Sequence, residues 1–207
     1  MITCPYCGTN YQAFQPNCKN CGAPLPMPAG SNAPMAADAA GDNPPPSPPR
    51  PVADSYAWRL MLADGWAVVG FVFVLLGAIF TLVGAALTLG IITALVGLPF
   101  LVLGLGFLAV GGALASSRLT AARQTVRVLR EGQATDGTIA SVEQNLNVRV
   151  NGRNPWTITY QFRAGGQQQE GRVTTLNDPG AYLQPGRAAY VLYLPQSPQY
   201  NSLYPHP

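Results

Sequence analysis

The chain has 207 residues, of which only 10% are charged, and its formal net charge at neutral pH is +3. So small a net charge argues against the strongly basic surface of a typical nucleic-acid-binding protein. The shortage of charge is also local, because no Asp, Glu, Lys, Arg or His occurs anywhere in residues 65–117, and this excludes a single globule of uniform composition.

Residues 1–25 contain all four cysteines, as two Cys-x-x-Cys-Gly pairs separated by ten residues. Two such turns can present four thiolates to one zinc ion, which prefers a tetrahedral ligand set. Four cysteines leave no open coordination position, so the predicted ion is structural. The alternatives are a pair of disulfides, which need an oxidising compartment, four thiols that bind nothing, and an iron–sulfur cluster, which this spacing favours less. The predicted ligands are Cys4, Cys7, Cys18 and Cys21.

The stretch CPYCG…CKNCGAPL, residues 4–25, resembles the short N-terminal zinc-ribbon family found on many prokaryotic membrane and regulatory proteins. The resemblance implies a small metal-stapled module commonly used for protein contact, without fixing a function. A segment this short cannot hold a core unaided, so we expect the ion to supply its folding free energy. Tyr6, Tyr11 and Phe14 are predicted to form its small core. Its only cation is Lys19, so phosphate binding is not expected.

Residues 26–54 contain nine prolines and few aromatic or branched side chains. This composition predicts a disordered linker, with a polyproline II segment at residues 44–51. The motif PPSPPR within it has the spacing of proline-rich ligands of peptide-binding domains, but a spacer is the favoured interpretation.

Residues 55–117 are predicted to hold a juxtamembrane segment and two transmembrane helices, at about 66–88 and 93–115. As one helix, the uncharged stretch at residues 65–117 would be roughly 80 Å long, whereas the hydrocarbon core of a bilayer is about 30 Å thick. Two spans joined by a short turn at TLGIIT fit this thickness. Neither span carries an ionisable residue, and transport pathways usually do, so a transporter or channel is not expected.

Glycine recurs every seventh residue along both predicted spans. A heptad spacing keeps the glycines on one stripe of each helix, and small residues let helix backbones approach closely. We therefore predict a tight antiparallel hairpin whose glycine stripes face each other. A homo-oligomer joined through the stripes, or a mere abundance of glycine in membrane helices, remain alternatives. The stripes are Gly70, Gly77 and Gly84, and Gly90, Gly97, Gly104 and Gly111.

Arginines lie before the first span and after the second, and none lies in the turn. By the positive-inside rule, this predicts an integral inner or plasma membrane protein with two spans and both termini in the cytoplasm. Residues 118–131 are predicted to form a cytoplasmic helix. On it, Arg123, Arg127 and Arg130 share one face, where they either contact anionic lipid headgroups or only fix the topology.

Residues 132–207 are predicted to form an all-β domain, a small antiparallel barrel or strongly twisted sheet of five or six strands. Ile158, Tyr160 and Phe162 alternate with polar residues and are expected to point into its core. The segment 187–195 is apolar on both faces and is predicted to be the central strand. The other predicted strands are 135–143, 145–150, 156–162 and 167–176, with a hairpin turn at the Asn-Gly pair of residues 151–152.

Residues 132–204 also resemble a bacterial membrane-tethered β domain of unknown function. The features that carry the resemblance are GTIASV at 137–142, YQF at 160–162 and VLYLPQSPQYNSLY at 191–204. The resemblance implies proximity to a membrane and supplies no activity.

Catalytic groups are sparse along the chain. The single histidine is His206, and the acids of the β domain do not occur in pairs, so an acid–base constellation is not expected. We therefore expect not an enzyme but a membrane-anchored binding or scaffold protein that faces the cytoplasm, carries structural Zn²⁺ and docks a protein partner. The alternative is a regulator whose zinc ribbon contacts nucleic acid or senses zinc.

Overall fold

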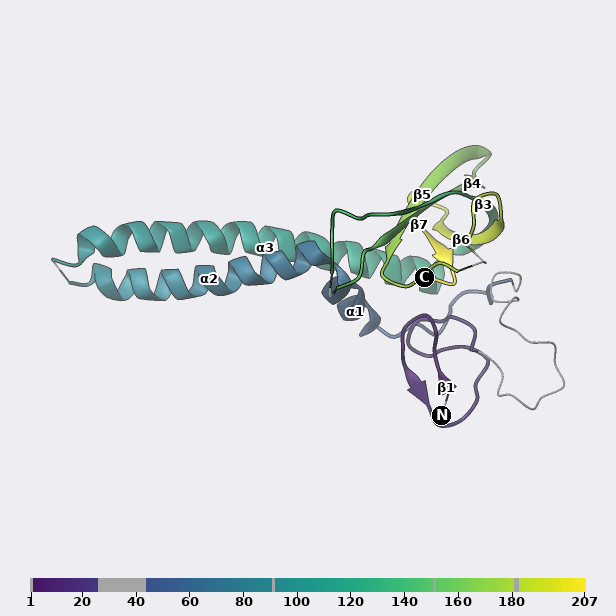
Figure 1. The fold of residues 1–207 in the computed structure, drawn as a ribbon, viewed down its shortest axis with the longest axis horizontal. Helices are drawn as coiled ribbons and strands as arrows, with labels where there is room; N and C mark the ends of the chain where they lie inside the picture. The colour runs from purple at the N-terminus through teal and green to yellow at the C-terminus, as the bar shows by residue number, and fades with distance from the viewer. Residues whose placement is uncertain (1, 26–43, 91, 151, 181–182) are drawn as a thin grey trace. The chain divides into compact units, whose positions relative to one another are not determined.

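A computed structural model describes residues 2–25, 44–90, 92–150, 152–180 and 183–207 (Figure 1). It contains a cysteine cluster near the N-terminus, two long apolar helices and a C-terminal antiparallel sheet, as the sequence predicts. The chain divides into two compact units. One comprises residues 57–123, and the other joins residues 1–56 to residues 124–207.

Two long helices make up most of the 57–123 unit. Helix α2 runs over Gly65–Thr88 and helix α3 over Ala94–Glu131, and Figure 1 shows them side by side with their turn at one end. The described turn residues carry no charge, and the Thr93 hydroxyl donates to the carbonyl of Leu87 at 2.6 Å, satisfying one of the carbonyls that a helix end leaves unpaired.

Helix α3 is longer than the sequence pattern predicts. The span expected at 93–115 and the separate helix expected at 118–131 are one continuous helix. No glycine or proline falls between residues 113 and 131. The hydroxyls of Ser116 and Ser117 donate to the carbonyls of Ala113 and Leu114 within the same helix, so these serines do not cap a new helix where the composition turns polar. Pro99 lies near the start of α3.

The glycine stripes face each other within the hairpin, as predicted. A Cβ added at Gly77 would lie 2.6 Å from the backbone nitrogen of Leu108 and 2.9 Å from the carbonyl oxygen of Gly104. The same antiparallel register recurs one heptad away in each direction, pairing Gly70 with Gly111 and Gly84 with Gly97. Gly90 is the exception, because it lies in the turn between the helices.

Helix α1, Tyr56–Ala63, precedes the hairpin. It is separated from α2 by Asp64, whose backbone is extended (φ −85°, ψ 115°) and whose carboxylate accepts a hydrogen bond from the Trp66 amide at 2.8 Å. Asp64 is therefore the N-cap of α2 and separates it from α1. Asp64 also pairs with Arg118 of α3 at 3.5 Å, so a charge pair marks the base of the hairpin.

The β domain is a five-stranded antiparallel sheet in the order β5-β4-β3-β6-β7. Strands β5 and β7 also come into contact, so the sheet is nearly a barrel. Across this closure the Tyr160 hydroxyl donates to Asn201 Oδ1 at 2.8 Å. The strands are β3 Gln133–Gln144, β4 Trp156–Ala164, β5 Gln167–Thr175, β6 Ala188–Leu194 and β7 Ser197–Tyr204.

The alternation predicted for β4 is confirmed, because Ile158, Tyr160 and Phe162 are all buried in the domain core. Two other strand predictions are wrong. Residues 145–150 form a loop in which Leu146 and Val148 are exposed, and none of the described strands of the sheet pairs with this segment. The middle position of the sheet belongs to β3 rather than β6, although Val191 and Leu192 of β6 are fully buried on opposite faces, as predicted.

Residues 44–54, assigned to the disordered linker by composition, are ordered by tertiary contacts. Arg50 is buried, and its guanidinium donates to the carbonyl oxygens of Leu129 at 3.3 Å and Gly132 at 2.8 Å. These carbonyls lie at the C-terminal end of α3, where unpaired acceptors favour a cation. The remainder of the predicted linker, residues 26–43, lies outside the described residues.

Candidate metal centre

Two backbone turns of the same geometry hold the four cysteines. In the first turn, the Cys4 amide donates to the carbonyl of Thr9 at 2.8 Å, and the Gly8 amide donates to that of Cys4 at 2.8 Å. The second turn repeats this with Cys18, Ala23 and Gly22 at 2.7 and 2.8 Å. Gly8 and Gly22 have φ of 68° and 77°, a conformation that side chains disfavour, which is why glycine follows each pair.

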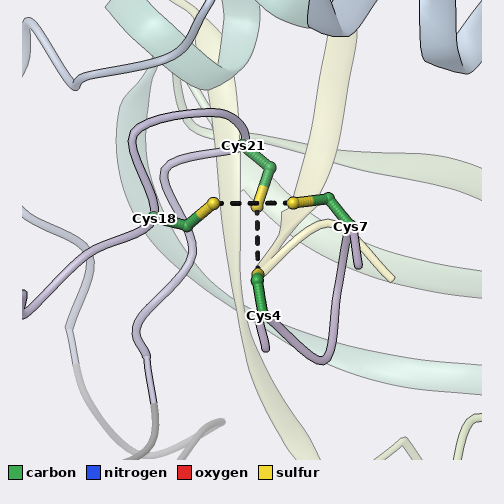
Figure 2. A group of neighbouring side chains, drawn as sticks. All are labelled: Cys4, Cys7, Cys18 and Cys21. Atoms are coloured by element: carbon green, nitrogen blue, oxygen red, sulfur yellow. Dashed lines mark hydrogen bonds between the residues drawn. The ribbon is translucent and has the colours of Figure 1, made fainter. Parts of the chain in front are cut away.

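The two turns bring all four predicted ligands together (Figure 2). The Sγ atoms of Cys4 and Cys21 are 3.7 Å apart, and those of Cys7 and Cys18 are 3.5 Å apart. All four sulfur atoms lie within 4.8 Å of one another. Cys4, Cys18 and Cys21 are buried and Cys7 is half-buried. This cluster can hold one metal ion.

The thiols influence one another strongly. Hydrogen bonds to Cys4 and then Cys7, followed by burial, raise the pKa of Cys21. In contrast, hydrogen bonds from Cys21 and Cys4 lower the pKa of Cys7. Opposite shifts on adjacent sulfurs show that these thiols do not ionise independently of one another. Four thiolates this close need a cation to offset their repulsion, and Lys19 is the only basic residue among residues 1–25.

Polar groups surround the sulfurs. The Tyr11 hydroxyl lies 3.1 Å from Cys18 Sγ, and the Thr9 hydroxyl lies 3.1 Å from Cys7 Sγ. Asn20 Nδ2 in turn donates to the Thr9 hydroxyl at 3.2 Å. Such outer groups orient metal ligands. Tyr11, which the sequence predicts in a small core, therefore lies beside a candidate ligand. Phe14, predicted for the same core, is exposed, so that prediction is wrong.

The C-terminal strand contacts the N-terminal segment next to its second cysteine pair. The Tyr204 hydroxyl donates to the carbonyl of Gly22 at 3.2 Å, and Asn17 Nδ2 donates to the same carbonyl at 3.2 Å. The Ala53 amide donates to the carbonyl of Asn20 at 3.1 Å. These contacts join residues far apart along the chain, so no local sequence pattern predicts them.

Two of the three arginines predicted to face lipid headgroups make contacts inside the protein. Arg130 forms an ion pair with Asp54 at 2.6 Å and donates to the carbonyl of Val52 at 2.7 Å. Arg127 pairs with Glu131 at 3.0 Å. Arg123 is exposed. A lipid contact by this helix face stays a prediction.

The β domain has an open polar hollow. Glu143 and Arg172 supply its charged side chains, and hydroxyls of Ser141, Thr157 and Thr159 line it. The single histidine lies elsewhere, where His206 is buried with its ring edge against Tyr56. Burial lowers the pKa of His206 to about 4, so at neutral pH it is an uncharged packed side chain.

Comparison with known proteins finds no matching family model, no matching curated protein and no matching solved structure. The two family resemblances noted in the sequence therefore stay predictions.

Proposed function

We propose that this chain is a membrane-anchored binding or scaffold protein whose N-terminal module is stapled by structural zinc. The observation that carries the proposal is the uncharged helical hairpin, which packs through its glycines and leaves its large apolar side chains exposed. Leu75, Leu82 and Val102 are 63%, 72% and 63% exposed. The core helix of a soluble protein would bury such residues, whereas lipid solvates them.

The lengths of the helices agree with this proposal. Helix α2 has 24 residues, which at about 1.5 Å per residue gives roughly 36 Å against a hydrocarbon core of about 30 Å. The charged pair of Asp64 and Arg118 lies at one end of the hairpin, where it would face headgroups and water. Positive residues flank this end alone, which favours a cytoplasmic location for both termini.

Zinc is the proposed ion because the sulfur spacing suits it. Four thiolates at about 2.3 Å from a central zinc lie about 3.8 Å from one another in a regular tetrahedron, close to the 3.5 and 3.7 Å found here. The four ligands fill the coordination sphere, so the ion would fold the module and perform no reaction.

A binding role is proposed over catalysis because the candidate groups do not form an acid–base pair. The charged side chains that line the polar hollow are one carboxylate and one guanidinium, those of Glu143 and Arg172, and His206 is buried and uncharged. The ribbon and the β domain instead offer surfaces that a cytoplasmic protein could recognise.

The anchor is tested by alkaline carbonate extraction of membranes that contain the full chain, with reporters fused at each end in separate experiments. The proposal expects the chain to stay in the pellet and both reporters to be active only in the cytoplasm. Release into the supernatant, or reporters on opposite faces, would refute it.

The binding role is tested by photo-crosslinking from the ribbon in intact membranes. Cys18→Ser with Cys21→Ser should abolish a discrete crosslinked product, while Lys19→Gln, which leaves the ligands intact, should retain it. Equal products from both variants would remove the ribbon from the binding role, and crosslinks to nucleic acid lost in Lys19→Gln would favour the regulator alternative.

A further inference from the structure

Helix α1 exposes a large apolar face immediately before the hairpin. Trp58 and Leu62, one helical turn apart, are 50% and 59% exposed, and Trp66 at the start of α2 is 60% exposed. The opposite face of the same helix, with Ala57 and Met61, is buried. Two tryptophans exposed within nine residues of each other are costly in water, and tryptophan is enriched where a bilayer meets water.

Charge at this end of the hairpin is positive. The 57–123 unit carries three arginines, Arg59, Arg118 and Arg123, against one acid, Asp64, which gives a net charge of +2. None of these charged residues lies between positions 65 and 117. A surface that combines exposed tryptophan with net positive charge is complementary to anionic lipid headgroups.

The direction of α1 suits a helix that lies along a membrane surface. Figure 1 shows α1 turned well away from the axis of α2, with the break at Asp64, where the backbone is extended. If α2 crosses the bilayer, α1 therefore leaves the line of crossing. Helix α2 is longer than the hydrocarbon core by about 6 Å in total. Because Trp66 is the second residue of α2, this extra length would place it at headgroup level.

We propose that α1 is an interfacial helix, with Trp58 and Leu62 inserted among the headgroups and upper acyl chains of an anionic bilayer and the neighbouring arginines at phosphate level. This rests on the proposed insertion of the hairpin and adds to it a second, in-plane membrane contact. Its consequence is that the lipid composition of the membrane sets how firmly the base of the hairpin is held.

The test uses the full chain in vesicles of phosphatidylcholine and phosphatidylglycerol, with tryptophan as the depth reporter. Trp66→Phe and Trp156→Phe leave Trp58 as the only tryptophan, since the chain has three. Acyl chains brominated near the headgroup should quench Trp58 about twofold more strongly than chains brominated near the methyl end, because tryptophan prefers the interface. Equal or absent quenching by both lipids would overturn the proposal.

A matched variant separates this result from failure of the anchor itself. Leu75→Trp, in a chain whose three native tryptophans are Phe, places the reporter about 15 Å along α2 from its start, so deep bromines should quench it most. If this reporter is quenched and Trp58 is not, the hairpin is inserted and α1 is not interfacial. If neither is quenched, the anchor proposal fails as well.

A separate measurement tests whether anionic lipid is needed to hold α1 at the membrane surface. In phosphatidylcholine alone, aqueous acrylamide should quench Trp58 about twofold more than in the mixed vesicles, because the attraction between the arginines and anionic headgroups is lost. Identical acrylamide quenching in the two kinds of vesicle would overturn the charge component of the proposal.

Discussion

Replacing Gly77 by alanine tests the packing that holds the hairpin together. The new Cβ would lie 2.6 Å from the Leu108 nitrogen and 2.9 Å from the Gly104 oxygen. Helices α2 and α3 would have to separate by about 1 Å to restore van der Waals contact, and overpacking of this kind costs about 1–3 kcal/mol.

Gly106→Ala is the matched control, because it lies in α3 with open space where its Cβ would be added. Both substitutions gain the helix propensity of alanine, about 1 kcal/mol. The difference between the two variants therefore isolates the overpacking cost, and Gly77→Ala should be the less stable by about 1–3 kcal/mol.

The assay must detect helix separation, because separated helices remain helical in detergent. Fluorophores can be attached through azide-bearing residues that replace Leu82 and Val102, which are both exposed, so that the cysteines stay unmodified. Energy transfer between the two fluorophores then reports helix separation during titration with sodium dodecyl sulfate. Equal transition midpoints for Gly77→Ala and Gly106→Ala would refute the glycine-mediated packing.

Three further predictions concern the unit that contains the metal centre. Cys21→Ser should lower bound metal from one ion per chain to none, measured by mass spectrometry, and should abolish the thiolate-to-metal absorption of the cobalt-substituted protein; retention of either contradicts a four-cysteine site. Arg50→Met should destabilise this unit by about 1–3 kcal/mol, since two buried carbonyls lose their donor, whereas Arg163→Met, at an exposed position, should change the stability little. Equal melting temperatures of the two variants would argue against a stabilising role for the hydrogen bonds of Arg50 to the end of α3. His206 has its pKa lowered to about 4 by burial, below its unfolded value of about 6.5, so the unfolded state binds the proton first as pH falls. The neutral form therefore contributes stability that is fully present above about pH 6.5 and is lost toward pH 4, with about 1.4 kcal/mol lost by pH 5.5. His206→Gln should flatten this part of the pH–stability profile. An unchanged slope would refute the claim that His206 is buried in its neutral form.

The sequence alone determined the features that depend on local spacing. The two Cys-x-x-Cys-Gly turns are local structures, so their repetition was enough to predict that four sulfurs meet. The heptad spacing of Gly77 and Gly104 likewise follows from helix geometry, because residues seven apart return to the same side of a helix. The inward alternation of Tyr160 in β4 follows from the pleat of a strand.

The tertiary structure decided what depends on residues distant in the chain. Hydrophobic pattern shows that a strand is buried but not which strands flank it, so the middle position of β3 and the exposure of Leu146 could not be predicted. Composition placed Arg50 in a disordered segment, yet the carbonyls at the end of α3 supply the partners that order it. Tyr204 reaches Gly22 across most of the chain, and such a contact is set by how the elements pack rather than by any local preference.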